Sequence, residues 1–222
     1  MKVILFGATG MVGKAVLRQC LLDPDVEAVL SIGRSASGVS HAKLRDLVRE
    51  DMFDFSVEAA ALNGYDACFF CLGVSSAGMS EADYSRLTCD LTLAAARALS
   101  EANPRMVFCY VSGQGTDSSE QGRSMWARVK GRTENALLRL PFKGAYMLRP
   151  GFIQPLRGVR SRTALYQAFY SALGFLLPLL RRVAPDQITT TVRMGRALIR
   201  LAAEGYPRAI LTPADINRLA AE

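Results

Sequence analysis

The chain has 222 residues, 50% of them hydrophobic and 21% charged, which is enough to bury a substantial core in a single α/β domain. Its longest apolar stretch, residues 164–180, is interrupted by polar residues, a glycine and a proline, and falls short of the ~20 clean residues that a membrane span needs. The first expected strand begins at Lys2, which leaves no room for a cleaved leader. These features predict a cytoplasmic protein with no stable membrane insertion.

The net charge of +7 is unevenly distributed, since residues 1–111 carry a net −3 and residues 112–222 a net +10. This asymmetry indicates an anionic ligand, a membrane surface or a nucleic acid over the C-terminal half, or only a solvated basic surface. Arg157, Arg160 and Arg162 suit a phosphate or a carboxylate. We expect the partner to be a small-molecule substrate and not a nucleic acid. We expect the protein itself to be a monomer or a homodimer.

The first strand, residues 3–6, runs into a turn with three glycines, Gly7, Gly10 and Gly13, and then into a helix over residues 14–22. Strand, glycine turn and helix together form half of a mononucleotide-binding unit. Gly7 permits the sharp exit from the strand, Gly10 lets a pyrophosphate approach the backbone, and Gly13 lets the helix lie close to the sheet. The helix N-terminus then directs unpaired N–H groups at the phosphates, so the motif predicts dinucleotide binding.

The second strand, within residues 26–34, ends at Arg34. Sites for NAD usually offer an acidic side chain to the ribose hydroxyls at this point. A guanidinium instead suits a 2′-phosphate and can stack on adenine. Arg34 therefore favours NADP over NAD, which remains the alternative, unless Arg34 is only an exposed loop residue.

Strands and helices alternate through the rest of the chain, which predicts one domain over residues 1–222 with a doubly wound parallel sheet of about seven strands. Residues 151–186 break the alternation and are expected to form a small C-terminal substrate lobe over the cofactor cleft. The further strands fall near residues 44–48, 65–73, 105–113, 144–151 and 208–213, and long helices are expected over residues 81–101 and 122–140.

The pair Cys68 and Cys71 could indicate a redox or zinc motif, but both lie in an apolar segment that reads as a buried strand. Residues three apart on a strand face opposite sides of the sheet. We therefore interpret the five cysteines as buried small hydrophobic residues in a reducing compartment. His41 is the only histidine, so no metal site is expected and no Ser-His-Asp triad can form.

Four segments together resemble the atypical short-chain dehydrogenases/reductases, nearest to their NmrA-like and Tat-interacting-protein-like subgroup. FGATGMVG at residues 6–13 is similar to the glycine turn of that family, and YVSGQGTD at residues 110–117 to the end of its fifth strand. RVKG at residues 128–131 resembles its active-site helix, and LRPGFIQP at residues 148–155 the loop after its sixth strand. The resemblance implies a Rossmann fold and an NADP(H)-dependent oxidoreductase.

The resemblance also implies a set of cofactor contacts. Asp51 falls where the family often places an acidic residue near the adenine amino group, and the residues that follow the fourth strand bring backbone close to the dinucleotide. The full expected set is Gly7, Thr9, Gly10, Met11, Val12, Gly13, Arg34, Asp51, Met52, Cys71, Leu72, Gly73, Lys130, Pro150 and Gly151.

The catalytic half of the site departs from the family pattern. Family members that reduce carbonyls use a Tyr-x-x-x-Lys pair, in which the lysine holds the ribose and lowers the pKa of the tyrosine. Here Lys130 is present, but Trp126 stands four residues before it, and an indole N–H cannot transfer a proton near neutral pH. Ser112 is the expected hydroxyl partner at the end of the fifth strand, although Gly113 and Gln114 follow where serine often recurs. Ser112, Trp126 and Lys130 are the candidate catalytic residues.

Three hypotheses follow from this pattern. The protein is an NADP-dependent reductase or isomerase of a small carbonyl or sugar-like substrate, anionic or neutral, with another acid such as Tyr84, Tyr166 or Tyr170. Alternatively, it binds NADP(H) without catalysis, as a redox sensor or regulator. The third hypothesis is a peripheral membrane or lipid-handling protein that uses FLLPLLRR at residues 175–182.

Overall fold

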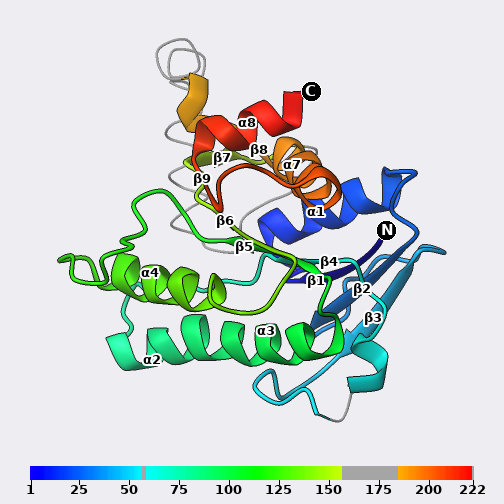
Figure 1. Cartoon of the computed structure of the whole chain (residues 1–222), viewed down its shortest axis with the longest axis horizontal. Helices are drawn as coiled ribbons and strands as arrows, with labels where there is room; N and C mark the ends of the chain where they lie inside the picture. Colours follow the sequence, from blue (N-terminus) through cyan, green and yellow to red (C-terminus); the bar gives the residue numbers. More distant parts are fainter. Residues whose placement is uncertain (57–58, 157–184, 222) are drawn as a thin grey trace.

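The computed structural model describes residues 1–56, 59–156 and 185–221 and contains a central sheet of seven parallel strands (Figure 1). The strand order is β3-β2-β1-β4-β5-β6-β9, the arrangement of a doubly wound Rossmann sheet, so the predicted fold class is confirmed. The strands are β1 (Lys2–Phe6), β2 (Ala28–Gly33), β3 (Leu44–Val48), β4 (Ala67–Phe70), β5 (Val107–Val111), β6 (Gly144–Leu148) and β9 (Ile210–Leu211).

The sheet is buried on both faces, which explains why its strands are apolar runs rather than alternating patterns. Strand β1 lies between β2 and β4, with Val3 level with Val29 on one side and Ala67 on the other. Its residues on one face pack in a cluster that contains Val3 and Leu5, and those on the other face in a second cluster around Phe6. The strand order reverses between β1 and β4, the place where doubly wound sheets bind ligands.

Helices cover both faces of the sheet (Figure 1). On one face lie α1 (Met11–Leu22), α7 (Thr191–Glu204) and α8 (Pro213–Ala221). On the other lie α2 (Glu81–Ser85), α3 (Leu91–Ala102) and α4 (Met125–Leu137). Helices α7 and α8 were not among the elements expected from the sequence. Thr190 caps α7, since its hydroxyl accepts a hydrogen bond from the Arg193 N–H at 3.1 Å.

The helix expected over residues 81–101 is present, but its middle is a π-helical segment, η2 (Arg86–Asp90), between α2 and α3. Helix α1 begins at Met11, three residues earlier than expected, because the glycine turn leads directly into it. Helix α4 begins at Met125 instead of near residue 122, because the N–H of Gly122 donates to the Asp117 carboxylate at 2.7 Å and holds the chain in a loop. A 3-10 turn, η1 (Ala59–Leu62), precedes β4.

The expected lobe over residues 151–186 lies largely outside the described residues, as do Arg157, Arg160, Arg162, Tyr166, Tyr170 and the apolar stretch of residues 164–180. The described residues on either side of this segment pair in a small parallel sheet of β7 (Phe152–Gln154) and β8 (Ile188–Thr190). The turn η3 (Pro185–Gln187) precedes β8. In the described part of the chain, no helix is long and apolar enough to cross a membrane.

The cysteines lie as the strand pattern predicts. Cys68 packs in the cluster around Phe6, whereas Cys71 packs against the cluster on the opposite face. All five are free thiols, and four are buried, which raises the pKa of Cys20 to about 12. Among the described residues, no group of histidine, cysteine and carboxylate side chains is placed to hold a metal ion.

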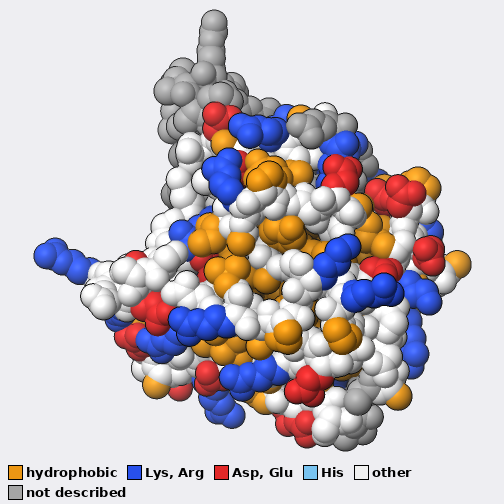
Figure 2. Space-filling model, viewed as in Figure 1, with side chains coloured by type: hydrophobic (Ala, Val, Ile, Leu, Met, Phe, Trp, Pro, Cys, Tyr) orange, Lys and Arg blue, Asp and Glu red, His pale blue; other side chains and the backbone are white. Residues whose placement is uncertain are grey.

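Basic side chains do not gather on the face drawn in Figure 2, where they lie among acidic and apolar ones. Several arginines of the basic C-terminal half pair with carboxylates, including Arg128 with Glu81 at 2.6 Å and Arg208 with Asp215 at 2.8 Å. Arg132, Arg149 and Arg200 also take part in ion pairs. These five arginines are therefore paired locally, but the net charge of +10 over residues 112–222 already includes all of their partners except Glu81.

The contact between α1 and the glycine turn leads to a stability prediction. A methyl group on Gly13 would overlap the carbonyl oxygen of Gly7, a backbone atom that cannot rotate away. We expect Gly13→Ala to lower the free energy of unfolding by at least ~1–3 kcal/mol, measured by urea denaturation. Gly73→Ala is the matched control, because a methyl there meets nothing within 4 Å. Equal unfolding midpoints for the two variants would contradict the expected close packing.

Candidate functional site

The turn after β1 is built from close backbone contacts that only glycine allows. Gly7 has φ +83°, and a Cβ on it would lie 2.8 Å from backbone atoms of Cys71 and Leu72. The N–H of Cys71 donates to the carbonyl of Phe6 at 3.1 Å, which ties the end of β4 to the end of β1. The two strand ends on either side of the switch point are therefore in direct contact.

The N-terminus of α1 is open to a ligand. Gly10 is the N-cap residue, and no side chain caps the helix at this end. The N–H of Gly10 itself donates to the Gly7 carbonyl at 2.9 Å, which closes the turn. The first N–H groups of a helix lack intrahelical partners and attract anions, so an uncapped glycine terminus at a cleft is suited to a phosphate group.

A cleft of about 460 Å³ lies at the carboxyl ends of β1 and β4. An adjoining hollow of about 270 Å³ shares Gly7, Thr9, Arg34 and Leu72 with it and extends along the end of β2. The walls of the larger cleft are formed by Gly7, Thr9, Gly10, Met11, Arg34, Glu50, Met52, Phe53, Cys71, Leu72, Gly73, Val74, Leu87 and Leu91.

Nine of the residues expected to contact the cofactor line this cleft, and the others lie elsewhere. Val12 packs against the core cluster under the sheet, and Gly13 is buried against the Gly7 carbonyl. Pro150 and Gly151 lie beyond β6, where the Gln114 N–H donates to the Pro150 carbonyl at 2.9 Å. Lys130 is on α4.

Asp51 does not line the cleft, in contrast to the expectation. Its carboxylate accepts a hydrogen bond from the Phe53 N–H at 2.7 Å, and Arg49 Nε donates to its carbonyl at 3.0 Å, so Asp51 shapes the turn after β3. The neighbouring Glu50 lines the cleft instead. A carboxylate two residues before a backbone N–H forms such local turns readily, which is why Asp51 bonds within the turn while Glu50 is the acidic residue on the cleft wall.

Arg34 is the basic side chain of the cleft. It is exposed, and its guanidinium makes no hydrogen bond or ion pair with the described residues. Glu50 lines the same cleft, so an incoming ligand meets one positive and one negative group near the ends of β2 and β3. The five guanidinium donors of Arg34 therefore remain available for an anionic group.

Five cleft residues were missed from the sequence: Glu50, Phe53, Val74, Leu87 and Leu91. Leu87 lies within the π-helical segment and Leu91 directly follows it, so this change of helical pitch brings both to the wall. The Phe53 ring lies 5.2 Å from the guanidinium of Arg86 in the same segment. The apolar type of the other four, Phe53, Val74, Leu87 and Leu91, carried no signal, since it equally suits a buried core.

The candidate catalytic residues converge at the end of β5. Lys130 Nζ donates to the carbonyl oxygen of Ser112 at 2.8 Å. The Ser112 hydroxyl donates to the carbonyl of Leu148 at 3.0 Å, so it is committed to the neighbouring strand β6. Burial lowers the pKa of the Lys130 ammonium to about 8, and the nearby Glu134 carboxylate opposes this shift.

Trp126 lies one turn before Lys130 on α4 and is half-buried. A methyl on Gly115 would come within 3.3 Å of the indole, so the ring lies against the loop after β5. It also packs beside the buried cluster of Tyr84, Cys89 and Val129. Tyr84 is only 2% exposed, which places it within this cluster rather than on the wall of the cleft.

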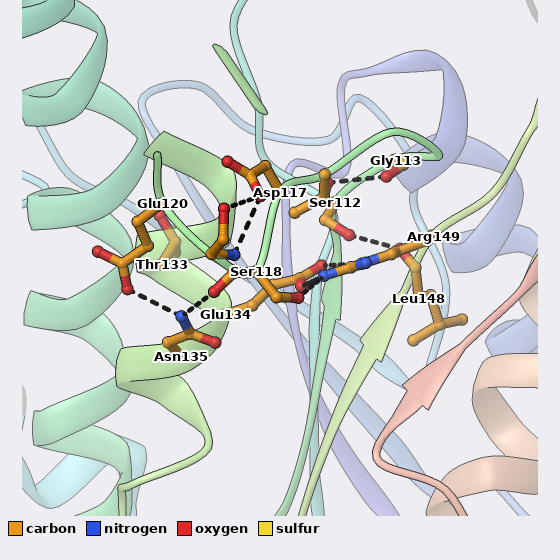
Figure 3. A network of polar contacts seen from close by, with 12 residues as sticks. Ser112, Gly113, Asp117, Ser118, Glu120, Thr133, Glu134, Asn135, Leu148 and Arg149 are labelled. Atoms are coloured by element: carbon orange, nitrogen blue, oxygen red, sulfur yellow. Dashed lines mark hydrogen bonds and ion pairs between the residues drawn. The ribbon is translucent and has the colours of Figure 1, made fainter. Parts of the chain in front are cut away.

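A buried ion pair fixes α4 to the end of β6 (Figure 3). Glu134 is fully buried, and both its oxygens accept hydrogen bonds from Arg149 Nε at 3.1 Å. Arg149 Nη2 also contacts Glu134 and donates to Ser118 Oγ at 2.6 Å. The Arg149 guanidinium therefore joins the end of β6 to helix α4 through Glu134 and to the loop after β5 through Ser118.

The loop of residues 112–124 is held against α4 by further contacts (Figure 3). Asn135 Nδ2 donates to the Ser118 carbonyl at 3.0 Å and to Glu120 Oε1 at 2.8 Å. A methyl on Gly131 would overlap the carbonyl oxygen of Asp117, so the glycine of RVKG allows this close packing. These contacts position Lys130 and Trp126 relative to Ser112.

This network yields a second prediction. Arg149→Ala leaves the Glu134 carboxylate buried without its partner, which typically costs ~3–5 kcal/mol, so we expect a fall in unfolding free energy of that order. Urea denaturation measures it. The double variant Arg149→Leu/Glu134→Leu removes both charges and should recover most of the loss. A single variant as stable as the parent would mean that Arg149 does not neutralise Glu134.

Comparison with known proteins identifies relatives and a shared fold. No family model matches the chain. A protein named "fmp52, mitochondrial" from Emericella nidulans is 32% identical over 180 residues, which cover 78% of this chain and 76% of that protein. FMP52 from Eremothecium gossypii is 32% identical over 157 residues, which cover 69% of this chain and 66% of that protein.

The similar solved structures are short-chain dehydrogenase/reductase proteins. An oxidoreductase of that family from Burkholderia thailandensis has a TM-score of 0.68 at 17% identity, over 100% of this chain and 93% of its own. The Bordetella bronchiseptica enzyme WbmF, solved in complex with NAD⁺, has a TM-score of 0.67 at 15% identity, over 98% of this chain and 76% of its own. At such low identity these structures establish the Rossmann fold alone.

The cytoplasmic location expected from the sequence is contradicted by these relatives, whose names describe them as mitochondrial. Their names give neither a reaction nor a substrate. The identity and coverage are nevertheless sufficient to assign the family: this chain belongs to the fmp52 protein family.

Proposed function

We propose that the protein binds NADP(H) in the cleft at the ends of β1 and β4 and acts as an oxidoreductase of the atypical short-chain dehydrogenase/reductase type. The observation that carries this proposal is the cleft itself, where the uncapped N-terminus of α1 and the unpaired Arg34 line the switch point of the sheet. Solved structures of the same fold hold NAD, as in WbmF. The names of the relatives point to mitochondria as its location.

The residues of the cleft fit the parts of a dinucleotide. The pyrophosphate would lie at the N-terminus of α1, where Gly10 leaves room and backbone N–H groups lack partners. Arg34 would pair with the 2′-phosphate that distinguishes NADP from NAD. Glu50 opposes this preference by its charge, which leaves NAD as the second option.

The reactive end of the cofactor would lie toward β5. Phe70 of β4 is level with Tyr110 of β5, and each is followed two residues later by a residue of the proposed site, Leu72 on the cleft wall and Ser112 on the β5 side. Lys130, which is bonded to the Ser112 carbonyl, would hold the nicotinamide ribose beyond the cleft wall. When bound, the cofactor would supply a hydride to a small carbonyl or sugar-like substrate. The protein would act as a monomer or a homodimer.

A second candidate function is a non-catalytic NADP(H) sensor or regulator, as the resemblance to NmrA-like proteins suggests. Trp126 favours it, because an indole cannot donate a proton, and the Ser112 hydroxyl is already bonded to Leu148. Calorimetric binding of NADPH combined with an NADPH-oxidation assay over a panel of aldehydes, ketones and sugar nucleotides separates the two. Oxidation with any member supports the enzyme, and binding without oxidation supports the sensor.

The cofactor preference is testable at Arg34. A charge-assisted contact contributes ~1.5–3 kcal/mol, so we expect Arg34→Ala to weaken NADPH binding roughly ten- to a hundredfold and to change NADH binding little. Arg18→Ala is the matched control, because Arg18 is also exposed but does not line the cleft. Titration calorimetry of both cofactors measures the difference. Equal affinities of the parent protein for NADPH and NADH would exclude the proposed role of Arg34.

The position of Trp126 is testable by fluorescence, since it is the only tryptophan in the chain. An indole beside the nicotinamide would transfer its excitation to NADPH, whose absorption overlaps tryptophan emission. We expect saturable quenching by NADPH, a weaker change with NADP⁺ and no tryptophan signal in Trp126→Phe. Unchanged emission at saturating NADPH, with binding confirmed by calorimetry, would place the indole far from the cofactor.

A further inference from the structure

Reduction of a carbonyl needs a proton donor for the oxygen, and the described residues offer few at the end of β5. The Ser112 hydroxyl is committed to the Leu148 carbonyl, and the Trp126 indole N–H is too weak an acid to protonate a substrate near neutral pH. Tyr84 and Tyr110 are 2% and 1% exposed, which removes both phenols from the cleft. Burial also raises the pKa of Tyr110, so its phenol is a weaker acid than usual.

Lys130 differs from these groups in its surroundings. Its Nζ donates one hydrogen bond, to the Ser112 carbonyl at 2.8 Å, and an ammonium has three N–H donors. Within the described part of the chain, no carboxylate lies within ion-pair distance of it. The Tyr110 ring covers one side, with its centroid 5.7 Å from Nζ. At least one N–H of Lys130 is therefore free for a ligand beside the end of β5.

We propose that Lys130 is the acid that protonates the substrate oxygen, so that one side chain at the end of β5 both holds the cofactor ribose and supplies the proton. This inference rests on the proposed oxidoreductase function. The reduced cofactor would supply the hydride that adds to the carbonyl carbon. As the C=O π pair moves to oxygen, that oxygen takes a proton from the Lys130 ammonium, and the N–H bonding pair stays on nitrogen. The neutral amine that remains then regains a proton from solvent.

The electrostatic surroundings suit this role. Burial lowers the pKa of Lys130 to about 8, close to ambient pH, where a general acid is most efficient. The charged or titratable groups that face it are few: Glu134 on its own helix, Tyr110 on β5 and, beyond Glu134, Arg149 directly after β6. Below pH 8 the ammonium carries its proton, so the reduction rate should fall as pH rises through about 8.

The first experiment measures the ionisation of Lys130 directly. The chain has five lysines, so NMR of the ε-CH₂ groups in lysine-labelled protein should give few, assignable signals. One signal should titrate near pH 8, disappear in Lys130→Arg and shift when NADPH binds. A Lys130 signal that titrates above pH 10, or that does not respond to bound NADPH, would overturn the proposal without reference to any substrate.

The second experiment measures NADPH oxidation with the carbonyl panel across pH 6–10. Removal of a general acid typically costs ~10²–10⁴-fold, so we expect such a loss of kcat in Lys130→Met. We expect a comparable loss in Lys130→Arg, whose guanidinium keeps the charge but does not release its proton. Lys143→Met is the matched control, because Lys143 is exposed and remote from the loop after β5.

Calorimetry on the same variants distinguishes failure of this proposal from failure of the proposed function. If Lys130→Arg binds NADPH normally and still oxidises it at the parent rate, Lys130 is not the acid, although the oxidoreductase function stands. A large loss in Tyr166→Phe or Tyr170→Phe with a flat pH profile for the parent would also overturn the role of Lys130. Absence of oxidation with every panel member would refute both proposals, while NADPH binding would still support the cofactor site.

Discussion

The close backbone contact between the turn after β1, the start of α1 and the end of β4 is the constraint on which the rest of the structure depends. Gly7 can adopt its positive φ and touch the backbone of Cys71 only because it lacks a side chain, and Gly13 brings α1 onto the same turn. These contacts leave the helix N-terminus uncapped at the edge of the cleft. The same geometry that closes the fold at this point therefore presents the unpaired N–H groups on which the proposed phosphate contact depends.

The arrangement of residues at the end of β5 depends on a different kind of interaction. Helix α4 is held by the buried pair of Glu134 and Arg149 and by the close approach of Gly131 to the loop after β5. A buried ion pair contributes little net stability compared with apolar packing, but it tolerates few alternative arrangements. We infer that its main effect is to fix the orientation of Lys130 and Trp126 relative to Ser112.

Much of this architecture could be predicted from the sequence, because the strands are continuous apolar runs and the three glycines have a strong positional meaning. The cleft residues near the turn followed from the same motif, as did Arg34. Two features could not be predicted: the π-helical pitch that places Leu87, and the position of Glu50 rather than Asp51 on the wall of the cleft. Both depend on local hydrogen bonds that leave no periodic signal in the chain. Helix α7 does carry such signals and could have been predicted, since Met194, Ala197, Leu198 and Leu201 are buried at helical spacing and Thr190 caps its start.

The two halves of the site differ in how strongly they constrain the chemistry. On the proposed cofactor side, backbone geometry would determine what binds, and its signal in the sequence is three glycines. On the β5 side, the proposed chemistry depends on single side chains, and the indole of Trp126 offers no acidic proton. Lys130 remains there with its ammonium partly desolvated and hydrogen-bonded to a neutral carbonyl. An anchor for a ribose needs only the charge of the lysine, whereas an acid must also release a proton to the substrate oxygen, and an ammonium with one of its three N–H groups bonded to Ser112 has donors left for both.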